Sequence, residues 1–544
     1  MSEPSKKQNF LQGAALLAIA TAIVKLIGAF YKLPLNMAIG AEGYSYFTTA
    51  YDIYSVMLLI STAGLPVAVS RMISQASTLE HSTRMRKIFR TALVMFAFMG
   101  ALTSVLMIFG AKPLANVMNQ PDAWISIACL GPCGILICLM SAYRGYFNGQ
   151  RDMAPTSVTQ VIEAFVKLVV GLALAFLLIR MTGKVALAAG GAILGVTMGS
   201  AIALVYMLAK FRPAYRSLPV TDEDPGTTKD TVKELLTIAI PITIGSAGLQ
   251  LLTVIESGLY MDRLVHLMET GQYMSHMVEG TVTAQKAAAT LKGLFNMTQT
   301  IFNMPCAFIP AITMSIIPAI TSHITLMNDK AVCATEESAA RITGLISMPC
   351  AVGLFILGEP VTALIGGYEG EKLVLAGQLM ALMGVGVFFY SIVQLTNAVM
   401  QAHGHASIPV VNMLLAGVMR LIIVYLLTGN PSIQLLGAPI GAALCYLCIG
   451  ILNLIAMRKV IPQKPAITKN LLRPLIPSVV MGIAALAVWL GLKQATDSRL
   501  FLCAIPVMVG VAIYAFLAIK LKAITKEDCL LLPKGDKIAK ILHL

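Results

Sequence analysis

The chain has 544 residues, of which 57% are hydrophobic and only 12% carry a charge. Soluble domains carry about 25% charged residues, so this composition excludes an ordinary soluble protein and indicates an integral membrane protein. The formal net charge of +14 would suggest a nucleic-acid partner in a soluble protein, but here it predicts cationic loops facing the cytoplasm and no nucleic-acid partner.

The first apolar run follows the polar start MSEPSKKQNF. A secretory signal peptide also begins this way, and residues 18–20 resemble a cleavage site. However, the apolar run continues past these residues, and further apolar segments follow. We therefore interpret residues 10–38 as a first transmembrane helix that is not cleaved.

A membrane-spanning helix needs about 20 mostly apolar residues. The first half of the chain predicts six, near residues 10–38, 46–70, 91–111, 123–143, 157–179 and 186–209. Eight more are predicted near 236–258, 293–322, 342–362, 373–398, 408–428, 436–457, 471–492 and 500–520. The sequence thus predicts an all-α polytopic membrane protein with about 14 transmembrane helices.

These helices group into two lobes of six, with two extra helices at the end. We expect an N-terminal lobe at 1–210, a cytoplasmic linker at 211–235, a C-terminal lobe at 236–460, two extra helices at 461–522 and a basic tail at 523–544. Loop cations concentrate on one side of this topology, so we expect both termini to lie in the cytoplasm. Lys286 and Lys292 fall in a predicted outer loop.

Two segments suggest an internal duplication. Each has a glycine-containing turn, a proline and then one cation inside the helix: Pro155 precedes Lys167 by twelve positions, and Pro409 precedes Arg420 by eleven. Because each lobe has an even number of helices, the pseudo-two-fold axis should stand along the membrane normal, with a cavity between the lobes.

Charges inside the predicted spans cost about 2.5–3.5 kcal/mol each on insertion scales, so they usually face a cavity or a partner. We single out seven charged residues of these spans: Lys25, Lys32, Asp52, Glu163, Lys167, Glu256 and Arg420. In this set four cations stand against three acids, which favours an anionic ligand such as a pyrophosphate or a carboxylate over a cationic drug.

These positions allow different roles. Lys25 and Lys32 lie seven residues apart and share a helix face. Lys32 could instead extend to the lipid headgroups, and Asp52 could neutralise one of the two lysines. Glu163 and Lys167 have the i,i+4 spacing of a structural ion pair. Glu256 is either a gate or cavity acid or an interfacial residue.

No motif for catalysis or a cofactor is present. The chain lacks a phosphate-binding loop, and all seven histidines lie in predicted loops or tails. His403 and His405 alone are weak evidence for a metal, and the cysteines, including Cys445 and Cys448, are better explained by helix packing. We therefore expect a transporter rather than an enzyme, with no metal and no cofactor.

Three stretches carry a family resemblance: KLIGAFYKLPLNMAIGAEGYSYFTTAYDIYSVMLLISTAGLPVAVSRMIS, SAYRGYFNGQRDMAPTSVTQVIEAFVK and FNMPCAFIPAITMSIIPAIT. They resemble lipid II flippases of the Gram-positive MurJ type and stage V sporulation protein B. Both belong to the multidrug/oligosaccharidyl-lipid/polysaccharide exporter superfamily. The resemblance implies a fourteen-helix fold and transport of a lipid-linked cell-wall precursor to the outer leaflet of a bacterial plasma membrane by alternating access.

In this family, basic residues of helices one, two and eight meet the substrate pyrophosphate. Lys25 matches the first basic position, and Lys32 matches the second with an offset of one residue. The chain departs from the pattern at helix two, where Asp52 is the charged residue. It also departs at helix eight, where three polar residues stand in place of arginine: Asn296, Gln299 and Thr300.

Several alternatives remain open from the sequence. Rival functions are a cation-coupled multidrug exporter, an exporter of another polysaccharide unit and a non-transporting scaffold for envelope assembly. The expected partners are a lipid-linked saccharide, membrane lipids, a coupling ion (H⁺ or Na⁺) and cell-wall synthesis proteins. Asp52, Glu163 and Glu256 are the candidate ion-coupling acids.

Overall fold

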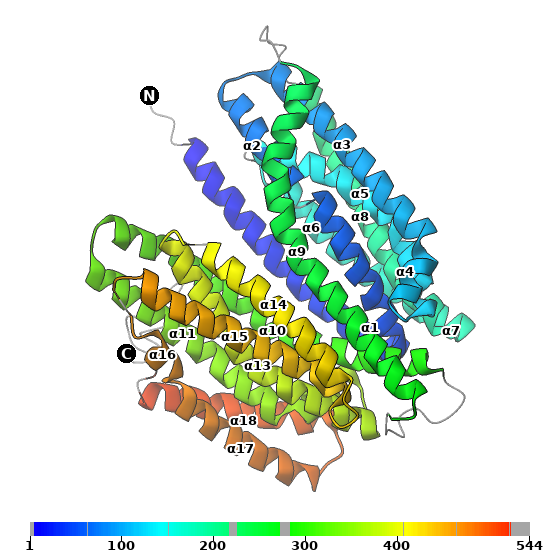
Figure 1. The fold of residues 1–544 in the computed structure, drawn as a ribbon, viewed down its shortest axis with the longest axis vertical. Coiled ribbons are helices and arrows are strands. Elements are labelled where there is room, and N and C mark those ends of the chain that lie inside the picture. Colours follow the sequence, from blue (N-terminus) through cyan, green and yellow to red (C-terminus); the bar gives the residue numbers. More distant parts are fainter. Residues whose placement is uncertain are drawn as a thin grey trace. The chain divides into compact units, whose positions relative to one another are not determined.

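The computed structural model describes residues 5–62, 64–150, 152–216, 226–272, 283–405, 407–463, 465–521 and 523. Across these ranges the chain forms helices and no strands, as predicted (Figure 1). Ten helices of the described part are long and apolar enough to cross a membrane. The expected total of about 14 spans stays a prediction.

The first half of the chain forms α1 (Ser5–Thr62), α2 (Leu65–Thr78), α3 (Ser82–Phe109), α4 (Ala111–Val117), η1 (Pro121–Ala123), α5 (Trp124–Gly149), α6 (Ala154–Val166), η2 (Lys167–Gly171), α7 (Leu172–Thr182), α8 (Val185–Arg216) and α9 (Thr228–Glu269). The second half forms α10 (Ala284–Thr325), α11 (Asp329–Ile356), α12 (Gly358–Gly366), α13 (Gly370–Ala402), α14 (Ser407–Thr428), η4 (Gln434–Leu436), α15 (Gly437–Val460), α16 (Ile467–Leu472), α17 (Leu475–Lys493) and α18 (Arg499–Lys520).

The chain divides into two compact units. The first contains Met1–Val265 and Val282–Gly293, and the second contains His266–Thr281 and Leu294–Leu544. The divisions fall inside α9 and α10, and not in the predicted linker at 211–235. The lobe boundaries expected from the sequence remain a prediction.

Part of the predicted linker is helical. The α9 helix begins at Thr228, because the Thr227 hydroxyl accepts a hydrogen bond from the backbone N–H of Asp230 (3.1 Å), which satisfies an otherwise unpaired donor at the helix start. At the other end of the linker, α8 extends to Arg216. The middle of the linker and the predicted basic tail after residue 523 lie outside the described residues.

The first two predicted spans meet at a break inside α1. Gly40 has φ 67° and ψ 178°, a conformation that is open essentially only to glycine. The break redirects the chain without a loop, so the residues on its two sides belong to consecutive helical segments. The second segment ends at Thr62, and α2 begins with Pro66 in its first turn, where the missing N–H costs nothing.

Within the first unit, α5 packs against α1, α2, α3 and α8. Aromatic rings fill the contact of α3, α5 and α8: the Phe89 and Phe211 centroids lie 4.5 Å apart, and the Tyr146 centroid lies 5.1 Å from that of Phe211. Burial of such large rings contributes strongly to the stability of a core.

The η2 segment is a π-helical turn that begins at Lys167. It lies very close to α8, since a Cβ added to Gly195 would overlap the backbone of Gly171. Single π-turns inside α-helices occur frequently at functional sites. The π-turn therefore makes Lys167 a candidate functional residue.

The second unit is organised around α13, which packs against α11, α12 and α15, while α17 and α18 pair with each other. Its core is largely aliphatic, with Leu395, Val399 and Met400 of α13 in one buried cluster with Ala339 and Ala340 of α11.

Candidate functional site

Charged and polar side chains gather inside the first unit, on both sides of the α1 break at Gly40. Tyr31 and Lys32 precede the break, and Thr49 and Asp52 follow it. The first turns of α10 add Lys292.

Lys292 and Asp52 form an ion pair. The Lys292 Nζ lies 3.7 Å from Asp52 Oδ2 and donates a hydrogen bond to the Thr49 hydroxyl (2.6 Å). The Lys292 side chain is completely buried, whereas that of Asp52 is 27% exposed. A lysine buried this fully needs its counter-ion, so Lys292 is neutralised by Asp52.

Close backbone contact brings Lys292 to this position. A Cβ on Gly293 would overlap the Ala41 carbonyl oxygen, so only glycine lets α10 approach α1 here. The placement of Lys286 and Lys292 in a loop was wrong, because α10 begins at Ala284 rather than near residue 293. Their outer side stays a prediction.

A buried hydrogen-bond chain extends from this ion pair. Thr49 donates to the Gln120 side-chain oxygen (2.9 Å), and the Gln120 amide donates to the Ser45 hydroxyl (2.8 Å). Ser257 of α9 donates to Asp52 (3.4 Å). Each of these buried polar groups has a hydrogen-bond partner, so this series of hydrogen bonds holds the Asp52 and Lys292 pair in position.

Glu163 is paired with Arg144 and not with Lys167. The Arg144 guanidinium lies 2.7 Å from the Glu163 carboxylate, which also accepts a hydrogen bond from Ser200 (3.2 Å). This corrects the expected i,i+4 pair. A guanidinium on the neighbouring α5 reaches the carboxylate directly, while Lys167 turns toward an aromatic ring.

That ring belongs to Tyr31, and the Lys167 Nζ lies 5.4 Å from its centroid. The Tyr31 hydroxyl donates to the Ala192 carbonyl (3.1 Å), which holds the ring in place. A cation over an aromatic face is stabilised by roughly 0.5–2 kcal/mol, which does not neutralise its charge.

Lys32 is the second cation of this region, next to Tyr31 in α1. It is attracted electrostatically by Asp52 and repels Lys167. Both lysines are half-buried, and neither has a hydrogen bond or an ion pair with any residue of the described part. Lys167 is likewise attracted by Glu163. Because Asp52 and Glu163 are already paired with Lys292 and Arg144, these two carboxylates face four cations, and Lys32 and Lys167 are the two in excess, called uncompensated below.

Two further predicted residues lie in the first unit. Lys25 is within α1, and its side chain is outside the described part. Glu256 of α9 is only 5% exposed. Its role as a gate or cavity acid or as an interfacial residue stays a prediction.

The remaining predicted site residues belong to the second unit. Arg420 of α14 is half-buried and is an electrostatic neighbour of Tyr446. Asn296 and Thr300 of α10 are buried and Gln299 is half-buried. The Thr300 hydroxyl donates to the Asn296 carbonyl (2.9 Å).

One buried pair of the second unit was missed. His403, at the end of α13, places Nε2 2.7 Å from Oε1 of Glu336 in α11, and both side chains are buried. His266 and His323 also lie in helices, which corrects their placement in loops. Within the described ranges there is no cluster of three or more metal-ligating side chains.

Comparison of the sequence with protein-family models identifies the family of the chain. Residues 10–323 match the sequence model described as polysaccharide biosynthesis protein, and this match spans more than half of the chain. The chain belongs to the polysaccharide biosynthesis protein family. Residues 264–508 also match the sequence model of the lipid II flippase MurJ.

Relatives in Bacillus subtilis match most of the chain. It is 24% identical to the uncharacterized membrane protein YabM (99% of this chain, 97% of the relative) and 21% identical to the lipid II flippase MurJ (95% and 96%). It is 22% identical to stage V sporulation protein B (84% and 85%). The predicted family resemblance is confirmed.

Solved structures confirm the fold. A lipid II flippase MurJ in an inward closed conformation superposes with a TM-score of 0.68 at 14% identity, covering 93% of this chain and 99% of its own. An inward-facing multidrug resistance MATE family transporter gives 0.59 at 15% identity, with 82% and 99% covered. The fold is therefore that of the MurJ and MATE transporters, in a multi-pass membrane protein.

Proposed function

We propose that the chain is a flippase for an anionic polyprenyl-pyrophosphate-linked saccharide, such as a lipid II-like peptidoglycan precursor. It would move this lipid from the inner to the outer leaflet by alternating access. The observation that carries the proposal is the presence of two uncompensated cations, Lys32 and Lys167, inside a unit of a chain with this transporter fold.

The chemistry of such a substrate explains why these cations would be retained. A pyrophosphate and a sugar head group cannot cross about 30 Å of hydrocarbon unaided, because charged and polar groups lose their hydration there. Two lysines would replace part of that hydration by charge-assisted hydrogen bonds to the phosphate oxygens. The polyprenyl tail can stay in the lipid meanwhile.

A cation-coupled multidrug exporter is the main alternative, and the charge pairing disfavours it. A cationic drug needs a free acid, yet Asp52 is paired with Lys292 and Glu163 with Arg144. In a non-transporting scaffold, two unpaired cations inside the membrane would lower stability and serve no function. An exporter of another polysaccharide unit would also bind an anionic lipid, so this alternative differs least from the proposal.

The remaining predicted roles belong to this proposal. Lys25 and Arg420 would contribute to substrate binding, and the polar residues of helix eight (Asn296, Gln299 and Thr300) would add neutral contacts. Asp52, Glu163 and Glu256 would be the candidate acids for a coupling H⁺ or Na⁺, and such an ion would have to displace Lys292 from Asp52 or Arg144 from Glu163. The protein would act in the bacterial plasma membrane without catalysis, with both termini cytoplasmic, alongside cell-wall synthesis proteins.

Replacement of Lys32 or Lys167 by Gln tests the proposal in cells depleted of their own lipid II flippase. A hydrogen bond to a charged group contributes about 1.5–3 kcal/mol, so each variant should translocate the precursor at least about tenfold more slowly. Translocation is measured as the fraction of labelled precursor that becomes accessible at the outer leaflet. Lys493→Gln is the control, since this lysine is exposed and paired with Glu359.

Arginine at position 32 should retain much of the activity, because the positive charge is kept. Normal translocation by the Lys32→Gln and Lys167→Gln variants at normal protein levels would contradict the proposal. Efflux of a cationic dye that depends on Asp52 but on neither lysine would favour the exporter instead.

A further inference from the structure

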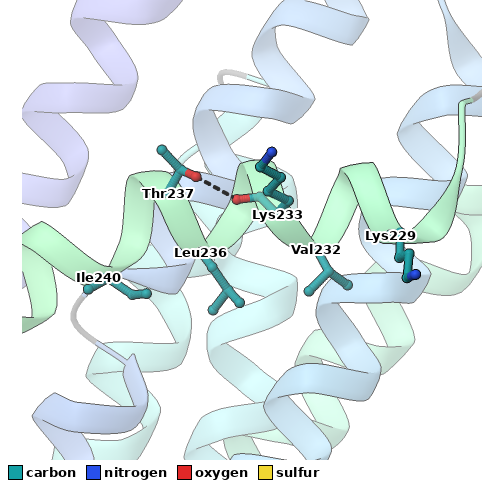
Figure 2. Close-up of a pocket in the computed structure, with 6 residues that line it drawn as sticks. All are labelled: Lys229, Val232, Lys233, Leu236, Thr237 and Ile240. Atoms are coloured by element: carbon teal, nitrogen blue, oxygen red, sulfur yellow. Dashed lines mark hydrogen bonds between the residues drawn. The ribbon is translucent and has the colours of Figure 1, made fainter.

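A surface groove lies along the first turns of α9, in the first unit. It has a volume of about 490 Å³ and is lined by Lys229, Val232, Lys233, Leu236, Thr237 and Ile240 (Figure 2). None of these residues belongs to the site that contains Lys32 and Asp52.

The chemistry of the groove changes along the helix. Lysines occupy its first turns, next to the predicted cytoplasmic linker, and apolar side chains follow toward the predicted span at 236–258. Val232 and Leu236 point to the same side of α9 (Figure 2), and Leu236 and Ile240 are both exposed. A cationic end that continues into an exposed apolar stripe matches an anionic amphiphile.

The lysines of the groove are available to a ligand. No acidic side chain of the described part lines the groove, and neither Lys229 nor Lys233 has an ion pair with a described residue. The Thr237 hydroxyl already donates to the Lys233 carbonyl (2.7 Å), so the two ammonium groups are the side-chain donors left for a ligand.

A neighbouring groove of about 450 Å³ shares Lys233 with this one and adds Arg71, Asp230 and Glu234. Glu234 is also paired with Arg84 (3.5 Å). Four cations (Arg71, Arg84, Lys229 and Lys233) thus stand against two acids at these grooves, so the start of α9 keeps a net positive charge that attracts an anion.

We propose that the groove of Lys229 and Lys233 binds an anionic phospholipid of the cytoplasmic leaflet. The two ammonium groups bind the phosphate, and an acyl chain runs along Val232, Leu236 and Ile240. Attraction of basic residues to anionic lipid at the membrane surface supplies the selectivity, and apolar contact along α9 adds affinity. This binding site is independent of the transported substrate.

Photocrosslinking of the full chain in nanodiscs tests this site. Phosphatidylglycerol with a photoreactive acyl chain is titrated into discs of otherwise zwitterionic lipid, and the crosslink yield on residues 228–240 is measured by mass spectrometry. In the Lys229→Gln/Lys233→Gln variant, the probe concentration at half-maximal yield should rise roughly fivefold per lysine, or roughly 25-fold for both.

Matched controls separate this site from general surface charge. Arg458→Gln/Lys459→Gln removes two exposed cations at the end of α15 and should leave the titration on α9 unchanged. Lys229→Arg/Lys233→Arg keeps both charges and should also bind normally.

Three results would overturn the inference. The first is equal crosslinking by a photoreactive phosphatidylcholine, and the second is an equal loss of crosslinking on α9 in the Arg458→Gln/Lys459→Gln control. The third is displacement of the probe by a polyprenyl diphosphate at lower concentration than by unlabelled phosphatidylglycerol, which would assign the groove to the transported lipid.

Discussion

Lys292 and Asp52 form an ion pair whose two members differ in solvent access. Lys292 is fully buried, while the Asp52 side chain is 27% exposed. Removal of one member of a buried pair leaves the other charge uncompensated, which costs more than the pair itself contributes. We therefore expect this pair to stabilise the first unit, whatever else Asp52 does.

Asp52→Asn should lower the free energy of unfolding by about 3–5 kcal/mol, because Lys292 then lies buried without a counter-ion. Thermal unfolding of the protein in detergent measures the change. The double variant Asp52→Asn/Lys292→Met should recover most of the loss, and failure to recover would contradict the account. As a control, Glu359→Gln breaks an exposed pair with Lys493 and should change stability by less than about 1 kcal/mol.

Lys167, unlike the Asp52 and Lys292 pair, should not stabilise the protein. Its ammonium lies over Tyr31 without an ion pair in the described part, so its charge costs stability inside a span. Lys167→Met should leave the melting temperature unchanged or raise it, while precursor translocation falls at least about tenfold. A parallel loss of melting temperature and transport would instead indicate a structural role.

At the residue scale, the sequence located charges inside the spans better than it located their partners. Spacing along one helix suggested a Glu163–Lys167 pair, but the partner, Arg144, comes from another helix. Lys292 was missed because the stretch AQKAAATLKG resembles a polar approach to a span. The signal that could have found it is the absence of any turn residue before Gly293 in that stretch.

Two glycines determine how the elements of the site meet. Gly40 lets α1 change direction between Lys32 and Asp52, and Gly293 lets α10 contact the backbone of Ala41 just beyond this break. Both positions depend on the missing Cβ, one for its backbone conformation and the other for space.

Gly293→Ala should destabilise the protein by at least about 1–3 kcal/mol, as overpacking of a tight contact does, because the new Cβ would overlap the Ala41 carbonyl oxygen. The matched control is Gly491→Ala in α17, where no atom lies within 4 Å of the new Cβ. That change should be neutral or stabilising, since alanine favours a helix over glycine. Thermal unfolding of both variants compares them, and equal melting temperatures would contradict the predicted contact.

The helices themselves were largely predictable, and their ends were not. The apolar run at 342–362 indicated a span, yet α11 starts at Asp329, where Asn328 accepts a hydrogen bond from the backbone N–H of Ala331 (3.2 Å). Hydropathy detects the segment that crosses hydrocarbon, whereas polar turns that extend a helix into water follow from capping. The same reason explains the early start of α9 at Thr228.

At the scale of the whole molecule, the fold and the family followed from composition, apolar periodicity and the motifs of the first two spans. The cargo did not, because relatives of similar identity include a lipid II flippase and a sporulation protein. In the proposed function, the positive charge in excess at Lys32 and Lys167 narrows the cargo to an anionic lipid. The proposed function thus makes a claim about the charge of the transported lipid.

Reconstitution into proteoliposomes tests that claim most directly. A fluorescent lipid-linked pyrophosphate saccharide is placed in both leaflets, and the fraction that becomes accessible to an external quencher is followed with time. We predict that the protein accelerates translocation and that Lys32→Gln/Lys167→Gln abolishes the acceleration at unchanged melting temperature. Translocation at the protein-free rate by the wild-type chain, together with transport of a cationic dye by the same vesicles, would contradict the account.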